Sequence, residues 1–191
     1  FAQSGTGAVN VTITAEAHIL VNDTLQLIDF GVCNAPAGST GTIHSIWNET
    51  ELNSTAAEIN CTGSNLNPNG SLIRIHNIGN SDLNLTVQTN IPANGTNSLL
   101  TSHTAKMHYK ALDYHRGDCA PQVGEFFANE SWAQFVTNDT EYIVCERLQY
   151  GDVSGEKRGV NLYLNLTIPS DATTSTTGNN ATLTFTAALP Q

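Results

Sequence analysis

The sequence predicts an all-β protein: a β-sandwich or jelly roll of about eight or nine strands, with one or two short helical insertions and an extended N-terminal strand. Three observations support this. Apolar and polar residues alternate with a period of two, the pattern of half-buried strands. Clusters of Gly, Pro, Asn, Asp and Ser separate these segments. Only 13% of residues are charged, about half the average share, so uncharged Asn, Thr and Ser supply most of the polarity.

The first predicted strand is unusually long. Its apolar face consists of Val9, Val11, Ile13, Ala15, Ala17 and Ile19, and Asn, Thr, Glu and His occupy the alternate positions. Small residues dominate the segment 1–8 before it. The strands expected after it are Leu25–Phe30, Thr42–Trp47, Ser71–Ile78, Leu83–Thr89, Ala105–Leu112, Glu141–Leu148, Val160–Ile168 and Ala181–Ala188.

Two segments break this rhythm. Asn48–Ile59 and Gly124–Val136 have apolar spacing compatible with short helices. The aromatic side chains of the second segment are expected to close one end of the sandwich, or alternatively to line a ligand site. They are Phe126, Phe127, Trp132 and Phe135.

The charge balance excludes one class of partner. With 17 acidic against 7 basic side chains, the net charge is −10, and binders of nucleic-acid backbones or anionic membranes need clustered Lys and Arg. The sequence has no apolar run long enough to span a membrane. It begins at Phe1 and has its only methionine at Met107, which indicates a processed start.

Glycosylation sequons are unusually frequent. Twelve of the 21 Asn begin an N-x-S/T sequon, whereas the Ser and Thr content predicts about four by chance. N-linked glycans are therefore expected at several of these sites, in an extracellular location. The sites are Asn10, Asn22, Asn48, Asn53, Asn60, Asn69, Asn84, Asn94, Asn129, Asn138, Asn165 and Asn180.

The four cysteines also suggest a secreted protein. They are Cys33, Cys61, Cys119 and Cys145, an even number without the C-x-x-C spacing of zinc or redox sites. The simplest pairing is sequential, Cys33–Cys61 and Cys119–Cys145, although four cysteines permit three connectivities.

No catalytic signature occurs, so no catalytic residue and no enzymatic activity are predicted. The six histidines show no close metal-ligand spacing, and no metal ligand is assigned. The acids expected in loops have two alternative interpretations: they bind one structural calcium, or they are simply solvated. They are Asp113, Asp118, Asp139, Asp152 and Glu156. Arg116-Gly117-Asp118 spells an integrin-binding tripeptide and is equally a polar turn.

The N-terminal strand offers a route to assembly. A strand behind a short segment of small residues can complete the sheet of a neighbouring subunit, gaining main-chain hydrogen bonds and burying Val9, Val11, Ile13 and Ala15. Such head-to-tail addition does not close and makes a filament. The alternative is that this strand is simply the first of its own sheet.

Four further segments have the pattern of sandwich strands and their turns: Ile28–Gly31, Ile73–Val87, Leu166–Ala172 and Ala181–Ala187. They resemble segments of secreted archaeal filament or pilus subunits, including archaeal bundling pili, and are similar to the biofilm-matrix filament proteins of the TasA and camelysin type. The resemblance implies a jelly-roll subunit whose N-terminal strand, residues 1–15, completes the sheet of the next subunit. Residues 16–191 then form a single domain.

The expected function is therefore a structural one. We expect a glycosylated subunit of an extracellular homopolymer acting in adhesion, biofilm or cell–cell contact, without a cofactor. The alternative is a monomeric secreted carbohydrate-binding or surface-layer module with an exposed aromatic platform from Trp47, Trp132 or Tyr114. A secreted hydrolase with paired carboxylates is a third option, and no pair is nominated.

Overall fold

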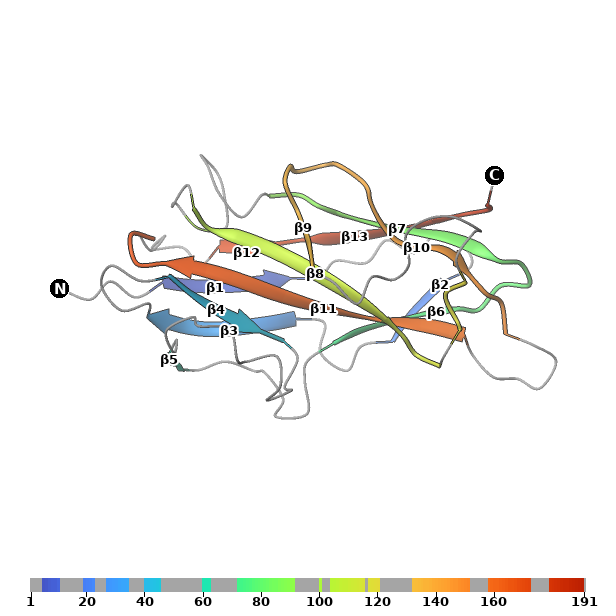
Figure 1. The fold of residues 1–191 in the computed structure, drawn as a ribbon, viewed down its shortest axis with the longest axis horizontal. Helices are drawn as coiled ribbons and strands as arrows, with labels where there is room; N and C mark the ends of the chain where they lie inside the picture. The colour runs from blue at the N-terminus through green and yellow to red at the C-terminus, as the bar shows by residue number, and fades with distance from the viewer. Residues whose placement is uncertain are drawn as a thin grey trace.

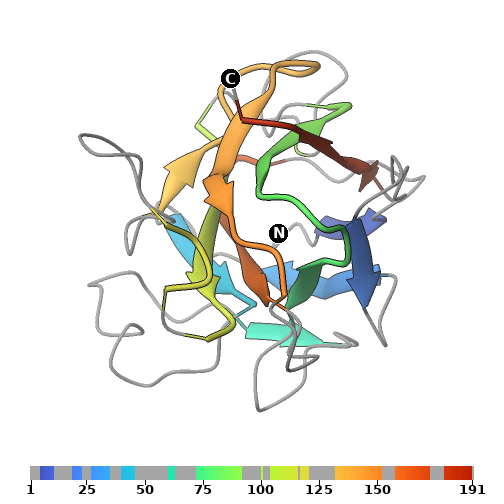
Figure 2. The ribbon, with the colours of Figure 1, turned by 90° about the vertical axis from the view of Figure 1, so that its right-hand side faces the viewer.

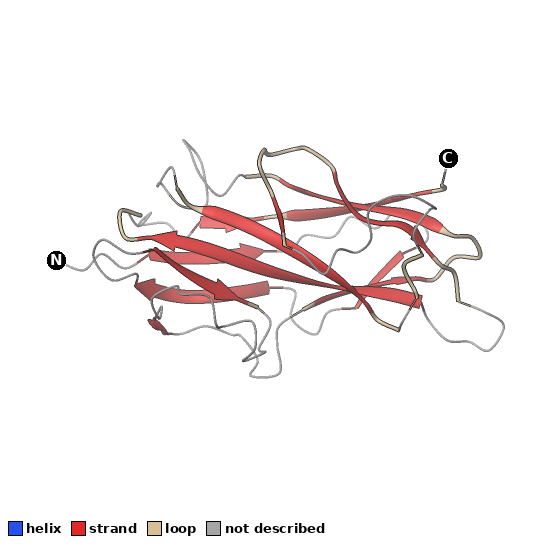
Figure 3. Cartoon of the chain, viewed as in Figure 1, coloured by secondary structure: helices blue, strands red, loops and turns tan. Residues whose placement is uncertain are grey.

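The computed structural model describes residues 5–10, 19–22, 27–34, 40–45, 60–62, 72–91, 100, 104–115, 117–120, 132–151, 158–172 and 179–190. These residues form thirteen strands and no helix (Figure 3). Most of the strands run roughly along the long axis of the molecule (Figure 1). The predicted all-β class is therefore confirmed for the described part of the chain.

The largest sheet is built around β11 (Arg158–Pro169), the longest strand. One edge of β11 pairs with β8 (Lys106–Asp113), and β9 (Ala133–Gln134) follows outside β8. The other edge pairs first with β6 (Ile73–Asn77) and then with β4 (Thr40–His44), while β2 (Ile19–Asn22) lies outside β6. Because β11 has twelve residues, two shorter strands share one of its edges. We call these six strands the β11 sheet.

Two smaller sheets complete the described strands. One has the order β10 (Tyr142–Leu148), β7 (Leu83–Thr89), β13 (Leu183–Ala188) and is antiparallel. The other has the order β12 (Asn179–Ala181), β1 (Gly5–Asn10), β3 (Leu27–Asn34), β5 (Asn60–Thr62). Only Thr182 separates β12 from β13, so a nearly continuous segment connects the two sheets.

One hydrophobic core is shared by these sheets. Residues alternate between buried and half-buried along β7, and the buried side of β11 carries Leu162, Leu164 and Leu166. Phe30 of β3 and Phe185 of β13 belong to the same cluster. In the view along the long axis the strands surround this core (Figure 2). Burial of apolar side chains at alternate strand positions is thus what holds the sheets together.

The predicted strands match β3, β4, β6, β7, β8, β10 and β11 with shifts at their ends, and the last one corresponds to β12 and β13. The N-terminal strand differs. Where one strand over 9–19 was expected, β1 ends at Asn10 and β2 begins at Ile19 in a different sheet. Residues 11–18 between them lie outside the described residues.

The prediction of a helix over Gly124–Val136 is wrong for residues 132–136, the part that the structure describes. Residues 133–134 form β9, and the Phe135 amide donates a hydrogen bond of 3.0 Å to the Met107 carbonyl, which continues the pairing with β8. Phe135 is 1% exposed and its ring lies 4.8 Å from that of Tyr109. Phe135 is therefore placed in the core by the pairing of its segment with the edge of β8, and not by a helix. Residues 46–59 and 121–131, with Phe126 and Phe127, lie outside the described residues.

Candidate functional site

β1 fills a position between two strands that are far apart in sequence. It pairs antiparallel with β3, from Gly5↔Cys33 to Asn10↔Leu27, and parallel with β12, from Gly7↔Asn179 to Val9↔Ala181. β3 and β12 are its two neighbours in this sheet (Figure 1). Without β1, each of them would have an open edge of backbone N–H and C=O groups.

The predicted donor residues are only partly described. Val9 lies in β1, and its Cα partners Ile28 and Ala181 are both buried. A register shift between Thr6 and Ala8 marks a bulge in the pairing with β3. Val11, Ile13 and Ala15 lie outside the described residues, as does the connection to β2.

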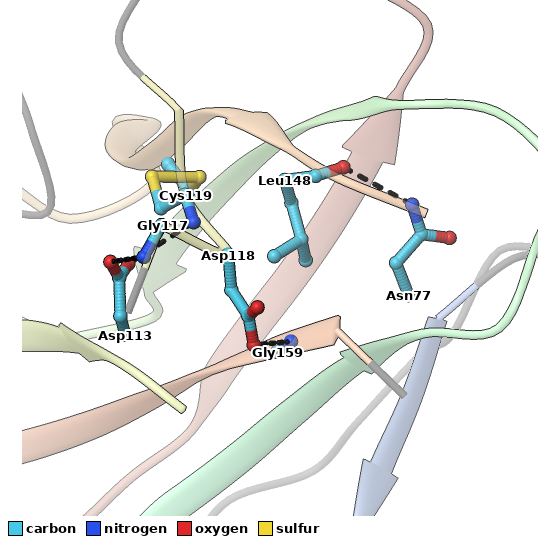
Figure 4. Close-up of a disulfide and its surroundings, with 8 residues drawn as sticks. Asn77, Asp113, Gly117, Asp118, Cys119, Leu148 and Gly159 are labelled. Atoms are coloured by element: carbon cyan, nitrogen blue, oxygen red, sulfur yellow. Dashed lines mark hydrogen bonds between the residues drawn. A yellow bond between two sulfur atoms is a disulfide. The ribbon is translucent and has the colours of Figure 1, made fainter. Parts of the chain in front are cut away.

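The structure contains the predicted disulfide between Cys119 and Cys145 (Figure 4). It ties the segment after β8 to β10, and both cysteines are buried. Cys33 and Cys61 are Cα partners in the antiparallel pair β3–β5. This register fits the predicted second bridge, whose sulfur positions lie outside the described side chains.

A buried carboxylate organises the turn beside the disulfide. Asp118 is 0% exposed and accepts hydrogen bonds of 2.9 Å from the amides of His115 and Gly159 and from the Arg158 guanidinium. Asp113 accepts two further bonds, from the amides of Gly117 and Cys119 (Figure 4). These bonds satisfy the carboxylate inside the fold and fix the start of β11.

This network rules out the integrin interpretation of the tripeptide. An integrin ligand must present its Asp carboxylate to the receptor, whereas the Asp118 side chain is buried and bonded within the chain. The described residues between Asp113 and Cys119 form a polar turn, with Gly117 at φ 90°, a conformation that favours glycine. Arg116 lies outside the described residues.

The calcium candidates do not come together as one site. The carboxylates of Asp113 and Asp118 bind backbone amides, and Asp139 accepts a hydrogen bond from Asn138. Among the described residues no group of three or more His, Cys, Asp and Glu is placed to hold a metal ion. Asp152 and Glu156 lie outside them.

The second surface of interest is the outer face of the β11 sheet. Leu162, Leu164 and Leu166 point to the core, so the alternate residues of β11 lie on the opposite face, together with their Cα partners. We define this outer face by Asn161, Tyr163, Asn165 and Thr167 of β11, Thr42 and His44 of β4, Arg74 and His76 of β6, Lys106, His108 and Lys110 of β8, and Gln134 of β9.

Charge is distributed unevenly over the molecule. The six strands of the β11 sheet contain four of the seven Lys and Arg, and Asp113 is their one acidic residue. These strands therefore carry a formal charge of +3 (4 − 1), which leaves −13 for the rest of a chain of net charge −10. Since the Asp113 carboxylate binds turn amides, the outer face has no acidic side chain among its described residues.

Two rings meet above the middle of this face. His44 and Trp132 have ring centroids 5.3 Å apart, although β4 and β9 lie on opposite sides of β11 and β8. The rings must therefore reach over the two central strands. The Lys110 ammonium lies 5.9 Å from the Trp132 ring centroid, within cation–π range. This arrangement helps explain why Lys110 is only 6% exposed and Asn165 only 7%.

His108 lies beside this covered region, opposite Asn165 and Gln134. Burial lowers the pKa of its imidazole below the ordinary value, a hydrogen bond with Asn165 opposes this shift, and the Lys106 charge adds to it. His108 is therefore held in its neutral form at neutral pH. At the other end of the face, Arg74 lies 4.5 Å from the Tyr114 ring centroid and donates a 3.0 Å hydrogen bond from Nε to Asn161 Oδ1.

The sequons fall into very different environments. Asn138 is exposed in a turn, Asn84 is half-buried on β7, and Asn165 is buried. Asn10, Asn22, Asn60 and Asn180 lie in strands whose side chains are not described at these positions. Asn48, Asn53, Asn69, Asn94 and Asn129 lie outside the described residues.

Sequence reasoning did not find the outer face or the Asp118 network. Alternation along single strands indicates which residues share one side, but strand register decides that His44, Asn165 and His108 form one row. A usable signal was present: in an acidic chain, the segments that form this sheet contain four Lys and Arg and only one acidic residue, Asp113.

No family model matches the chain, and no curated protein matches it. No helix in the described part of the chain is long and apolar enough to cross a membrane. The site is therefore interpreted from its own geometry.

Proposed function

We propose that this protein is the repeating subunit of a glycosylated extracellular filament, in which β1 of one copy takes the place between β3 and β12 of the next. The observation that carries the proposal is the position of β1 between two strands of distant sequence. Exchange of such a terminal strand recreates the same backbone bonds between copies, which makes it a low-cost route to assembly.

The connectivity supports exchange of this strand alone. β1 is the first of the described strands, and β2, the next of them, belongs to the β11 sheet. The eight residues 11–18 join them, a length that spans up to about 28 Å when fully extended. β1 can therefore move to a neighbour while β2 keeps its own pairing with β6.

The sheets also support a sandwich-like subunit. The β12–β13 segment connects the two smaller sheets, and strands of all three sheets contribute side chains to one core. We interpret this as the jelly-roll or β-sandwich fold expected from the resemblance to archaeal filament subunits. Head-to-tail exchange on such a subunit leaves every copy with one donor and one acceptor, so the polymer stays open.

A mixing experiment tests the exchange directly. Ala8 and Asp29 are Cα partners across β1 and β3, so Ala8→Cys and Asp29→Cys are introduced on separate chains and the two proteins are co-assembled. We expect a disulfide-linked dimer of the two variants on a non-reducing gel, and none from either variant alone. Linkage only within an Ala8→Cys/Asp29→Cys double variant, with none between mixed chains, would contradict strand exchange.

Deletion provides a second test. Removing residues 1–14 should yield subunits that form no fibres in negative-stain microscopy, because the donor is missing. The synthetic peptide 1–14 should bind them and raise their melting temperature. The same peptide with Val9→Asp should neither bind nor stabilise the deleted protein, because it would place a charge opposite the buried residues Ile28 and Ala181. The peptide with Ala8→Ser is the control and should behave as the unmodified peptide. Fibres from the deleted protein would overturn the mechanism.

The monomeric binding module remains the second candidate, because the outer face of the β11 sheet combines aromatic, amide and basic groups. It predicts a particle that remains monomeric as protein concentration rises in sedimentation velocity. The filament subunit predicts growth of assemblies under the same conditions.

A further inference from the structure

We propose that the outer face of the β11 sheet binds an acidic polysaccharide, a chain of sugars carrying carboxylate groups. This proposal does not rest on strand exchange, because β1 belongs to a different sheet. The surface for a partner would be the two parts of the face on either side of the row His44, Asn165 and His108. They are Arg74, Asn161 and Tyr163 on one side and Lys106 with Thr167 on the other.

Charge complementarity is the first argument. In a chain of net charge −10, a face without acidic side chains among its described residues attracts anions that the remainder of the protein repels. Lys106 is exposed, and Arg74 is half-buried with only its Nε in the hydrogen bond to Asn161. The guanidinium keeps a planar set of N–H donors suited to a carboxylate.

The neutral groups of the face provide the second argument. Tyr163 is half-buried on β11 beside Asn161 and offers a ring and a hydroxyl. Burial raises the pKa of Tyr163, so the hydroxyl keeps its proton, while the charge of Arg74 opposes this shift. Asn161 precedes it on the same face and adds an amide, and Thr167 adds a hydroxyl beyond the buried Asn165. A ring beside hydroxyl, amide and cationic groups matches a sugar ring that carries hydroxyls and a carboxylate.

The geometry also separates binding groups from structural ones. Lys110 and Asn165 are buried beneath the contact between His44 and Trp132, so they support the face and do not touch the polymer. Lys106 and Arg74 remain as the cationic contacts. Removing either should weaken binding without removing a buried partner of the core.

The test uses the full chain and polygalacturonate as the probe, with neutral dextran as the comparison polymer, in affinity gel electrophoresis. We expect retardation by polygalacturonate only, and loss of it at about 1 M salt, where the Debye length is about 3 Å. Arg74→Gln combined with Lys106→Gln should weaken binding at least about tenfold, the effect of losing one or two charged hydrogen bonds. Arg147→Gln, which removes a charge from β10 outside this sheet, is the control and should bind as the unmodified protein.

Three results would overturn the proposal. The first is equal binding of polygalacturonate and dextran, and the second is undiminished polygalacturonate binding by the double variant. The third is that the double variant changes self-association in sedimentation velocity while polygalacturonate binding is absent, which would assign the face to a contact between copies. None of these results bears on the cysteine mixing experiment, so the two proposals fail separately.

Discussion

The Arg158 guanidinium donates a 2.9 Å hydrogen bond to Asp118, a carboxylate that is completely buried. The pair links the turn after β8 to the first residue of β11, next to the disulfide. Its two partners come from segments forty residues apart, so the contact fixes tertiary structure and not only a local turn.

Asp118→Asn should destabilise the fold by about 3 kcal/mol, because it leaves the Arg158 guanidinium without its charged partner. The NH2 of Asn also replaces one of the two oxygens that accept hydrogen bonds from Arg158, His115 and Gly159. Urea denaturation measures this change. Asp139→Asn, at an exposed position, is the matched control and should shift the midpoint little. An equal effect of both substitutions would show that the network contributes no special stability.

Gly159→Ala should also destabilise the protein, by about 1–3 kcal/mol. A Cβ at this position would lie 2.7 Å from both His76 Nδ1 and the Ile75 carbonyl oxygen, and a backbone oxygen in a sheet cannot move aside cheaply. Thermal unfolding measures the loss. Gly117→Ala has open space but a φ of 90°, so its cost should come from backbone strain alone. An unchanged melting temperature for Gly159→Ala would contradict the close approach of β6 and β11.

Replacing Cys119 and Cys145 together by alanine should cost about 2–4 kcal/mol, since the bridge closes a loop with a sequence separation of 26 residues. A loss at least as large should appear when the unmodified protein is reduced, because reductant also opens the predicted Cys33–Cys61 bridge. The alanine pair should be insensitive to reductant at positions 119 and 145. Retained stability of the double variant would show that the surrounding hydrogen bonds suffice.

The free energy of unfolding should rise as the pH increases toward about 6.5. The pKa of His108 is lowered in the folded protein, so its imidazole binds a proton more readily in the unfolded chain. Lys106 and Lys110 on β8, with His44 and Tyr163 on the neighbouring strands, are the titratable groups around it. His108→Gln should flatten this slope in denaturation curves between about pH 5 and 7. A slope unaffected by the substitution would assign the pH dependence to other groups.

Sequon occupancy should follow exposure at the described sites. Asn138 should carry a glycan, because its amide lies in an exposed turn, whereas Asn165 should remain unmodified beneath the Trp132 and His44 rings. Glycopeptide mass spectrometry of the native protein compares the two sites. A glycan at every copy of Asn165 would contradict this prediction and would show that the side chain of Asn165 is exposed in the native protein.

Period-2 alternation predicted most strands well, because burial on one side imposes that pattern on each strand locally. β7 shows this most clearly, with the predicted Leu83–Thr89 as its bounds. The short strands β5 and β9 were missed, since two or three residues carry no detectable period. The helix expected around Trp132 was wrong at its described end because pairing with β8 overrides the local spacing of apolar residues.

The candidate sites depended on information that a single strand does not contain. Cysteine order correctly suggested Cys119–Cys145, because nearby cysteines have a high chance of meeting. The row of His44, Asn165 and His108 depends on the register of three strands, and the Asp118 network depends on the position at which β11 begins. Both are set by tertiary packing.

The sharing of one edge of β11 by β6 and β4 has a mechanical consequence. β11 runs along the long axis of the molecule (Figure 1), and its backbone bonds to β8, β6 and β4 are transverse to that axis. A pull along the axis would therefore load many hydrogen bonds in shear at the same time and would not unzip them singly. A fibre of such subunits would resist stretching through its central strand.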